Sequence, residues 1–89
     1  MEENYVYILE CSDHTYYTGW TRDIAQRVRT HNAGKGAKYT RGRLPVTLRY
    51  YELLDSKESA LKREYRIKRM TRTEKQALIT GFSQQKNGQ

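Results

Sequence analysis

Two polar residues lie on a helix face where apolar residues are expected. The spacing i, i+3, i+4 and i+7, typical of the stripe that a helix turns toward a core, is followed by Ile24, Arg27, Val28 and His31. Burying Arg27 and His31 costs free energy unless polar groups meet them. The strand end before this helix offers Tyr17 and the side-chain-free Gly19. The pattern predicts a polar site at the inner face of this helix.

A carboxylate occupies the same kind of stripe in a later helix. The stripe that we expect to face the sheet there consists of Ala60, Leu61, Glu64 and Ile67. An unpaired carboxylate in such a place is neutralised by a raised pKa or strongly destabilises the fold. Two solutions are open. Glu64 can form a partly buried ion pair with Arg27, or it can hold a divalent cation at the mouth of a cleft while Arg27 binds an anion.

Five polar side chains from separate elements thus converge on one small core. They are Tyr7, Tyr17, Arg27, His31 and Glu64. Taken alone, the two tyrosines can simply be strand residues that fill the core. Together the five suit phosphoryl chemistry, because carboxylates bind Mg²⁺ or Mn²⁺, arginine stabilises charge on transferring oxygens, and phenol or imidazole moves a proton. The convergence favours a catalytic site.

Length and cysteine content bound the class of protein. The chain of 89 residues is long enough for one domain with one core. The single cysteine, Cys11, cannot form an internal disulfide, and no apolar run reaches the length of a membrane span. The first residues also lack the pattern of a signal peptide. We therefore expect a cytoplasmic protein without a membrane partner, whose oligomeric state is unknown.

The charge balance indicates the kind of partner. Lys and Arg number 17 against 10 Asp and Glu, which gives a net charge of +7. A solvated cationic surface is one interpretation, and nucleic-acid binding is the interpretation that we favour. A membrane surface is disfavoured because no segment combines a bulky apolar face with a basic one.

A basic segment rich in glycine follows the first helix. We predict a loop from Gly34 to Pro45, because the segment has too much glycine for a helix and lacks the alternation of a strand. One aromatic residue interrupts its four cations, and the five are Lys35, Lys38, Tyr39, Arg41 and Arg43. Such a mixture can contact phosphates and stack on bases or sugars, or it can be an ordinary solvated loop.

Strand and turn signals predict an α+β fold. Aromatic and β-branched runs predict strands over residues 5–9, 15–18 and 47–54, with Gly19 ending the second strand. We expect a three-stranded antiparallel sheet with three helices, in the order β-β-α-β-α-α. The domain spans residues 4–80, and residues 81–89 form a polar, disordered tail.

Helix caps give the expected helix boundaries. Thr21 caps the first helix, which stops at 32–34. Asp55 with Glu58 forms a capping box for the second helix, which runs to about Met70. Thr71 with Glu74 opens the third helix, and Gly81 ends it.

The spacing of these motifs resembles the GIY-YIG nuclease domain. The resemblance covers residues 4–79 and rests on Tyr5-Val6-Tyr7, Tyr17-Thr18-Gly19, Arg27, His31 and Glu64. It is strongest to small, stand-alone bacterial members, whose Gly-Lys-Gly-Ala-Lys-Tyr-Thr-Arg-Gly loop matches residues 34–42. The resemblance implies metal-dependent endonuclease hydrolysis of nucleic acid, DNA more than RNA, structured or single-stranded.

The resemblance also implies a role for each residue. Tyr7 and Tyr17 lie beside the scissile phosphate, and one of them activates the attacking water. Arg27 steadies the phosphate, and His31 orients the site. Glu64 is the only metal ligand, for one Mg²⁺ or Mn²⁺ ion.

One departure from the family pattern leads to an alternative function. Trp20 stands where several members have a lysine near the phosphate, and we interpret it as a core residue or as a stacking platform for a base. The alternative is a catalytically weak or inactive nucleic-acid-binding module that kept the GIY-YIG fold.

Overall fold

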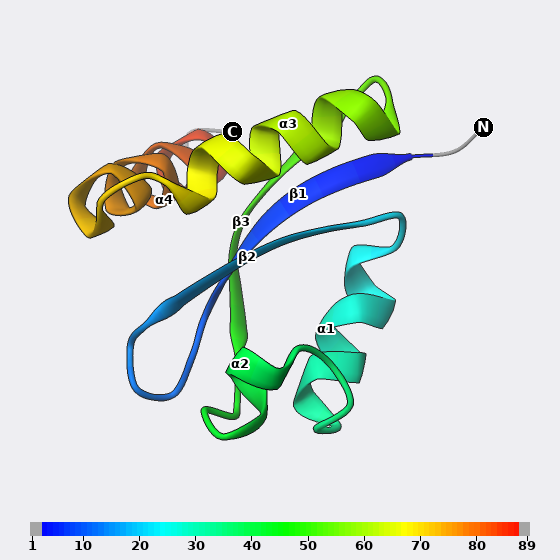
Figure 1. Cartoon of the computed structure of the whole chain (residues 1–89). Coiled ribbons are helices and arrows are strands. Elements are labelled where there is room, and N and C mark those ends of the chain that lie inside the picture. Colours follow the sequence, from blue (N-terminus) through cyan, green and yellow to red (C-terminus); the bar gives the residue numbers. More distant parts are fainter. Residues whose placement is uncertain (1–2, 88–89) are drawn as a thin grey trace.

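The chain folds into a three-stranded sheet with helices on both of its sides (Figure 1). The computed structural model describes residues 3–87. The elements follow in the order β1 (Asn4–Glu10), β2 (Tyr16–Thr21), α1 (Ile24–Asn32), α2 (Lys38–Arg41), β3 (Thr47–Leu54), α3 (Lys57–Lys68) and α4 (Arg72–Asn87). The predicted α+β class is confirmed. The structure adds the short helix α2 within the segment that we predicted to be a loop.

Strand β1 is the centre of the sheet. The strand order is β2-β1-β3, and both neighbours pair with β1 antiparallel, as predicted. Tyr7 pairs with Gly19 on one side and with Tyr51 on the other. Gly19 does not end β2, as we predicted, because the pairing continues to Thr21.

The two faces of the sheet bury alternate residues of β1, since successive side chains of a strand point to opposite faces. The α3 side holds a buried cluster of Val6, Ile8, Ala60 and Ile67. The other side holds a buried cluster of Tyr7, Leu9, Cys11 and Val46. Figure 1 shows α3 and α4 on one side of the sheet and α1 and α2 on the other. Tyr7 therefore enters the interior on the α1 side.

Helix α1 begins at a different cap from the predicted one. The cap is Asp23, whose extended backbone lets its carboxylate accept a hydrogen bond from the Gln26 N–H at 3.0 Å. Thr21 lies two residues earlier, and its hydroxyl oxygen accepts from the Asp23 N–H at 3.2 Å. The threonine thus supports the turn before the helix rather than the helix itself.

The capping box predicted for α3 is also wrong, whereas that of α4 is confirmed. The cap of α3 is Ser56, not Asp55 with Glu58, because the Ser56 hydroxyl accepts from the N–H three residues on at 3.0 Å. At α4 the Thr71 N–H donates to Glu74 Oε1 at 2.8 Å, and the Glu74 N–H donates to Thr71 Oγ1 at 3.2 Å.

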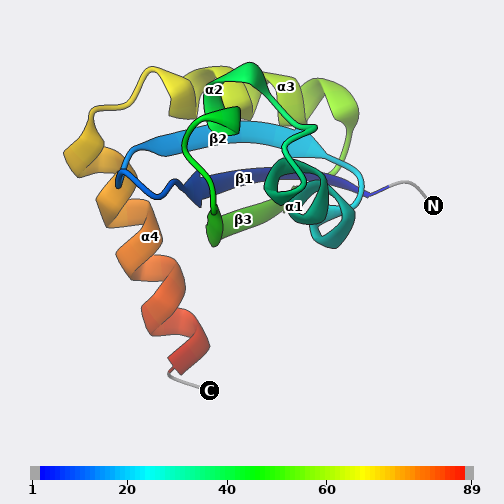
Figure 2. The same cartoon turned by 90° about the horizontal axis from the view of Figure 1, so that it is seen from below.

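Glycine marks one of the two predicted helix ends. Gly34 has a φ of 78°, and its N–H donates to the His31 carbonyl at 2.9 Å, so α1 ends there as expected. Gly81 does not end α4, which continues to Asn87 and extends away from the sheet (Figure 2). A glycine inside a helix costs only about 1 kcal/mol relative to alanine. Residues 88–89 of the predicted tail lie outside the described residues.

The structure also bears on the single cysteine and on membrane-spanning segments. Cys11 is buried and has a free thiol. Within residues 3–87, no helix has both the length and the apolar composition needed to cross a bilayer.

Candidate active site

Tyr7 lies at the centre of the site, with its side chain buried on the α1 side of the sheet. Its hydroxyl oxygen lies 3.1 Å from Nε2 of His31. A Cβ atom at Gly19, its partner on β2, would lie 2.6 Å from that oxygen. Such a contact is too close for a side chain to occupy. The glycine of β2 is therefore required by the position of the Tyr7 phenol.

A threonine from α2 fixes the protonation of His31. Thr40 is fully buried, and its hydroxyl donates to the carbonyl oxygen of Ala37 at 2.9 Å, because a carbonyl can only accept. The same oxygen lies 2.9 Å from Nδ1 of His31 and therefore accepts from Nδ1–H. In the neutral imidazole Nε2 then has no proton and accepts the hydrogen bond of Tyr7.

The pKa shifts agree with these donor and acceptor roles. Burial lowers the pKa of His31, and the positive charge of Arg27 lowers it further. Burial also raises the pKa of the Tyr7 phenol, with smaller effects from Tyr17, Arg27 and Glu64. At neutral pH the imidazole is neutral and the phenol is protonated.

The segment that leads into α2 passes close to the imidazole of His31. A Cβ atom at Gly36 would lie 2.4 Å from Nδ1, so only glycine lets the backbone approach this closely. Sequence reasoning missed the contribution of both Gly36 and Thr40 to the site. The signal was present in the tract from Gly34 to Gly42, which we interpreted through its charges alone.

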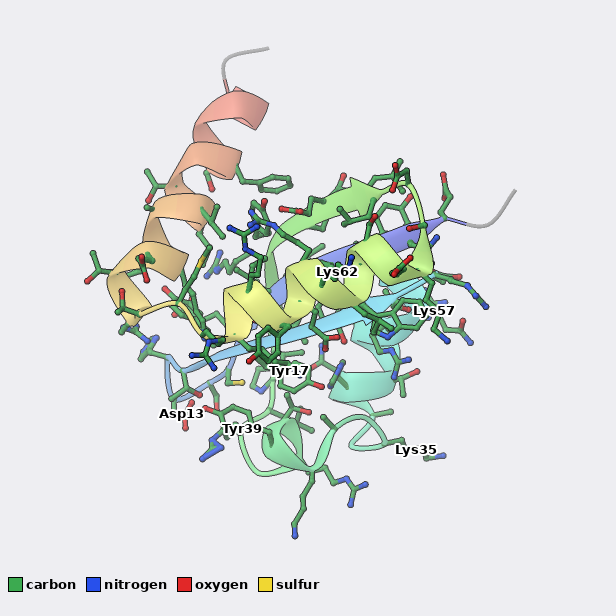
Figure 3. The ribbon with its side chains drawn as sticks, turned by 45° about the horizontal axis from the view of Figure 1, so that its top comes forward. Asp13, Tyr17, Lys35, Tyr39, Lys57 and Lys62 are labelled. Atoms are coloured by element: carbon green, nitrogen blue, oxygen red, sulfur yellow. The ribbon has the colours of Figure 1, made fainter. Side chains whose placement is uncertain are left out.

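Tyr17 supplies the second phenol of the site, at its open side. Its ring centroid lies 5.3 Å from that of His31 and 6.4 Å from that of Tyr7. Its other neighbour is Tyr39, which stacks on it with the centroids 6.1 Å apart. Figure 3 shows Tyr17 between α3 and the segment that carries Tyr39. The Tyr17 side chain is half-buried, and within residues 3–87 its hydroxyl has no hydrogen-bond partner.

Arg27 is exposed, so the prediction that it lies on the buried face of α1 is wrong. Ile24 and Val28 pack against the core instead, and Arg27 lies at the edge of the stripe. Its charge nevertheless lowers the pKa of both Tyr7 and His31. Within the described part of the chain, its guanidinium makes no hydrogen bond or ion pair. A cation without a protein partner thus lies beside the buried pair.

Arg27 also borders a shallow hollow of about 330 Å³. The residues that line it are Trp20, Thr21, Arg22, Asp23, Gln26 and Arg27. Two of these side chains are cationic and one is acidic, so the hollow can receive a single anionic group next to the Arg27 guanidinium.

Glu64 approaches the site from α3. Its side chain is only 16% exposed, and its carboxylate lies 3.1 Å from Nζ of Lys68, one turn further along the helix. The ion pair with Arg27 that sequence analysis left open is not formed. The negative charge of Glu64 raises the pKa of Tyr7, so it acts on the same site as Arg27. The carboxylate therefore borders the tyrosines without being buried unpaired.

The stripe of α3 that faces the sheet differs from the predicted one at Leu61. Ala60 and Ile67 are fully buried, whereas Leu61 is 42% exposed. Adjacent residues of a helix point about 100° apart, so Ala60 and Leu61 cannot both point at the sheet. Glu64 lies at the border between the two faces.

The possible metal ligands of the site limit the kind of metal ion that it could bind. The resemblance to GIY-YIG nucleases implies a divalent metal, and among residues 3–87 no group of three or more His, Cys, Asp or Glu side chains could enclose an ion. A single, largely buried carboxylate suits an ion that keeps most of its water and takes substrate oxygens as ligands, as Mg²⁺ does. Glu64 could therefore hold such an ion together with water and substrate, whereas the described residues do not form a site in which protein ligands alone surround a metal ion.

The basic segment divides into free and engaged cations. Lys35, Lys38 and Arg41 are exposed. Arg43 instead donates from Nε to Asp13 at 3.0 Å, and its guanidinium lies 4.0 Å from the ring centroid of Tyr39. Arg43 therefore holds Tyr39 and the β1–β2 turn together, which leaves the other three cations to face solvent.

Trp20 lies on the opposite side of the sheet from Tyr7. It is half-buried and packs against the cluster of Val6, Ile8, Ala60 and Ile67. Two cations flank its ring, Arg22 at 5.7 Å and Lys57 at 5.4 Å from the centroid. These contacts agree better with the interpretation of Trp20 as a core residue than with that of a stacking platform.

Comparisons with known proteins agree on one family. Residues 3–77 match the model of the GIY-YIG catalytic domain. A UPF0213 protein of Halobacterium salinarum is 63% identical over 76 residues, which are 85% of this chain and 99% of that protein. A UPF0213 protein of Streptococcus pyogenes is 57% identical over 83 residues, which are 92% of this chain and 90% of that protein.

Two solution structures share the fold. One is a UPF0213 protein from Bacillus halodurans, with a TM-score of 0.57, 47% identity, and coverage of 88% of this chain and 83% of that chain. The other is a protein from E. faecalis, with a TM-score of 0.61, 35% identity, and coverage of 93% and 92%.

Proposed function

Because the chain belongs to the GIY-YIG family, a nuclease superfamily, we propose that it is a metal-dependent endonuclease that hydrolyses phosphodiester bonds, in structured or single-stranded DNA. One observation carries the proposal. A buried hydrogen-bonded chain runs from Tyr7 through His31 to Thr40, and the Tyr17 ring centroid lies 5.3 Å from that of His31. The charge of Arg27 acts on Tyr7 and His31, and within residues 3–87 neither the Tyr17 hydroxyl nor the Arg27 guanidinium has a protein partner. A cation and a phenol left open near a buried proton acceptor are the arrangement expected of a catalytic site.

In the proposed reaction a proton leaves the attacking water along this chain. The Tyr17 hydroxyl orients the water. As the new P–O bond forms, the water gives its proton to the Tyr7 oxygen, and the Tyr7 proton passes to Nε2 of His31. Thr40 keeps the other imidazole proton on Nδ1. The P–O bond to the leaving sugar oxygen breaks, and that oxygen takes a proton from solvent.

Two charged residues complete the proposed site. Arg27 binds the non-bridging oxygens of the scissile phosphate and stabilises the charge that develops on them. Glu64 holds the metal ion, which supplies positive charge to the phosphate when bound. Lys35, Lys38 and Arg41 contact phosphates along the strand. Trp20 and Tyr39, whose rings have cations beside them, are proposed as secondary contacts with the strand.

A second candidate function is a nucleic-acid-binding module without catalysis. The observation that favours it is the 3.1 Å ion pair between Glu64 and Lys68, which occupies the carboxylate that a metal would need. This candidate predicts salt-dependent binding that metal does not change.

A cleavage assay separates the two candidates. Labelled single-stranded, duplex, flap and junction DNAs, with matching RNAs, are incubated with Mg²⁺, Mn²⁺ or EDTA. We expect Glu64→Ala and Arg27→Ala each to lower kcat/KM by about 10²-fold or more, since each removes charge stabilisation of the transition state.

Matched controls come from outside both proposed surfaces. Arg29→Ala removes an exposed arginine from α1, and Asp55→Ala removes an exposed carboxylate from the turn before α3. Both variants should cleave like the wild type. Metal-dependent cleavage that persists in Glu64→Ala would contradict the proposed metal site, and binding without cleavage of any substrate would favour the binding module.

A further inference from the structure

Two apolar side chains are exposed on the outer face of α3. Leu61 is 42% exposed and Tyr65, one turn later, is 62% exposed. They line a shallow hollow of about 670 Å³ together with Lys57, Glu58, Lys62 and Arg66. The nuclease site uses none of these residues.

Two of the cations around this pair, Lys62 and Arg66, are not held by strong contacts among the described residues. Arg66 makes no side-chain hydrogen bond or ion pair within residues 3–87. Lys62 approaches Glu58 at 3.8 Å, but both side chains are at least 75% exposed, so the pair is weak. Arg69 lies over the Tyr65 ring at 5.4 Å and donates to its hydroxyl at 3.1 Å. The Tyr65 ring is thereby held in one orientation.

The outer face of α3 is continuous with the candidate active site. Leu61 precedes Glu64 by three residues and Tyr65 by four, so it is next to both on the helix surface. Helix α3 also packs directly on β2, the strand that carries Tyr17. Figure 3 shows Lys57 and Lys62 on α3 in the same view as Tyr17, Tyr39 and Lys35.

We propose that the outer face of α3 holds the nucleic-acid strand outside the active site. Lys62 and Arg66 contact its phosphates, and Leu61 and Tyr65 contact its unpaired bases. A surface for phosphates alone needs only cations, whereas two exposed apolar side chains between cations suit a strand that offers planar bases as well. The inference rests on the proposed nucleic-acid function and adds a second surface on the far side of Glu64 from the basic segment.

The test measures binding in EDTA, where cleavage does not interfere. Fluorescence anisotropy follows a labelled oligo(dT) of roughly 20 nucleotides, long enough to reach past one site, over a series of salt concentrations. We expect K62Q/R66Q to reduce the slope of log affinity against log salt by about 1.4, which is about 0.7 for each lost phosphate contact. Tyr65→Ala should weaken binding about fivefold or more and leave the slope unchanged.

A double variant elsewhere controls for net charge. R29Q/R49Q also removes two exposed cations, from α1 and β3, and should change the slope by much less. Equal slopes in the two double variants would overturn the proposal. Full affinity in Tyr65→Ala, with its melting temperature unchanged, would overturn the base contact.

Failure of this inference is distinct from failure of the nuclease assignment. If the α3 variants bind like the wild type while the wild type still cleaves in Mg²⁺, the inference is wrong and the nuclease stands. If the wild type never cleaves but the α3 variants bind more weakly than R29Q/R49Q, the inference stands without the nuclease.

Discussion

Replacing Thr40 with valine tests the hydrogen-bond chain that orients His31. Valine keeps the branched shape and puts a methyl group in place of the hydroxyl. The Nδ1–H of His31 then loses its acceptor, which lies 2.9 Å away in the native protein. Leaving a buried donor without a partner costs about 1–3 kcal/mol. We expect the free energy of unfolding to fall by that amount, which lowers the melting temperature by about 4–8 °C for each kcal/mol.

If the imidazole changes tautomer, the unpaired buried donor moves from Nδ1–H to the Tyr7 hydroxyl, so the cost in stability is similar. With the proton on Nε2, the ring donates to the Tyr7 oxygen, and the phenol loses the acceptor for its own proton. Proton transfer by a positioned base contributes about 10²-fold or more to a rate. We therefore expect Thr40→Val to lower kcat by about 10²-fold with little change in the binding of nucleic acid.

Nitrogen-15 NMR of the imidazole, with Thr40→Ser as the control, gives the decisive measurement. Serine loses a buried methyl, at about 1 kcal/mol, but keeps the hydroxyl. Wild type and Thr40→Ser should carry the His31 proton on Nδ1, and Thr40→Val should carry it on Nε2. A wild-type protein with the proton on Nε2 near neutral pH would refute the reasoning. The reasoning would also be refuted if Thr40→Val and Thr40→Ser had the same His31 tautomer and lost the same amount of activity.

Two further predictions concern the pKa of His31 and the ion pair of Glu64. Burial holds the pKa of His31 below 6.5 in the folded protein. As the pH falls, the unfolded chain therefore takes up the His31 proton at a higher pH than the folded protein does. The free energy of unfolding should fall as the pH drops from 6.5 through the folded pKa. Urea titrations at about pH 7.5 and pH 5.5 should show a smaller fall in His31→Gln than in the wild type, and equal falls would contradict this. In the proposed site Lys68, whose Nζ lies 3.1 Å from the Glu64 carboxylate, competes with the metal ion. Lys68→Ala should therefore raise the affinity for Mn²⁺ about 1.5- to 5-fold, which corresponds to an ion pair worth about 0.2–1 kcal/mol. Calorimetric titration measures this, with Lys62→Ala as the matched control, and equal affinities in both variants would refute the competition.

Strand and helix spacing predicted which elements meet, but not the direction of every side chain. One helical stripe and one strand end predicted that His31 approaches β2, the strand that carries Gly19. The structure brings His31 against Tyr17 of that strand, with the ring centroids 5.3 Å apart. The same stripe wrongly placed Arg27 inside. Periodicity assigns a residue to a sector of the helix, whereas a long side chain at the border of the stripe can extend along the surface and keep its charge in water.

The segment before β3 shows a second limit of sequence reasoning. Its glycines and cations predicted a loop, and the short helix α2 was missed because four residues are too few to give a periodic signal. The role of Thr40 depends on that helix, which directs its hydroxyl inward onto Nδ1 of His31. No local pattern distinguishes a threonine that binds a histidine nine residues away from one on a solvated loop.

The two tyrosines have the same chemistry in the sequence and different environments in the fold. Tyr7 pairs with strands on both sides and is buried, whereas Tyr17 lies on the edge strand β2 with one ring face toward Tyr39. Burial raises the pKa of Tyr7, so its phenol stays protonated, and in the proposed reaction it passes that proton to His31. Tyr17 has an open hydroxyl and can contact water or phosphate directly. In the proposed reaction the sheet order therefore makes Tyr7 a relay to the interior and Tyr17 a contact with the substrate, a division that residue types alone could not give.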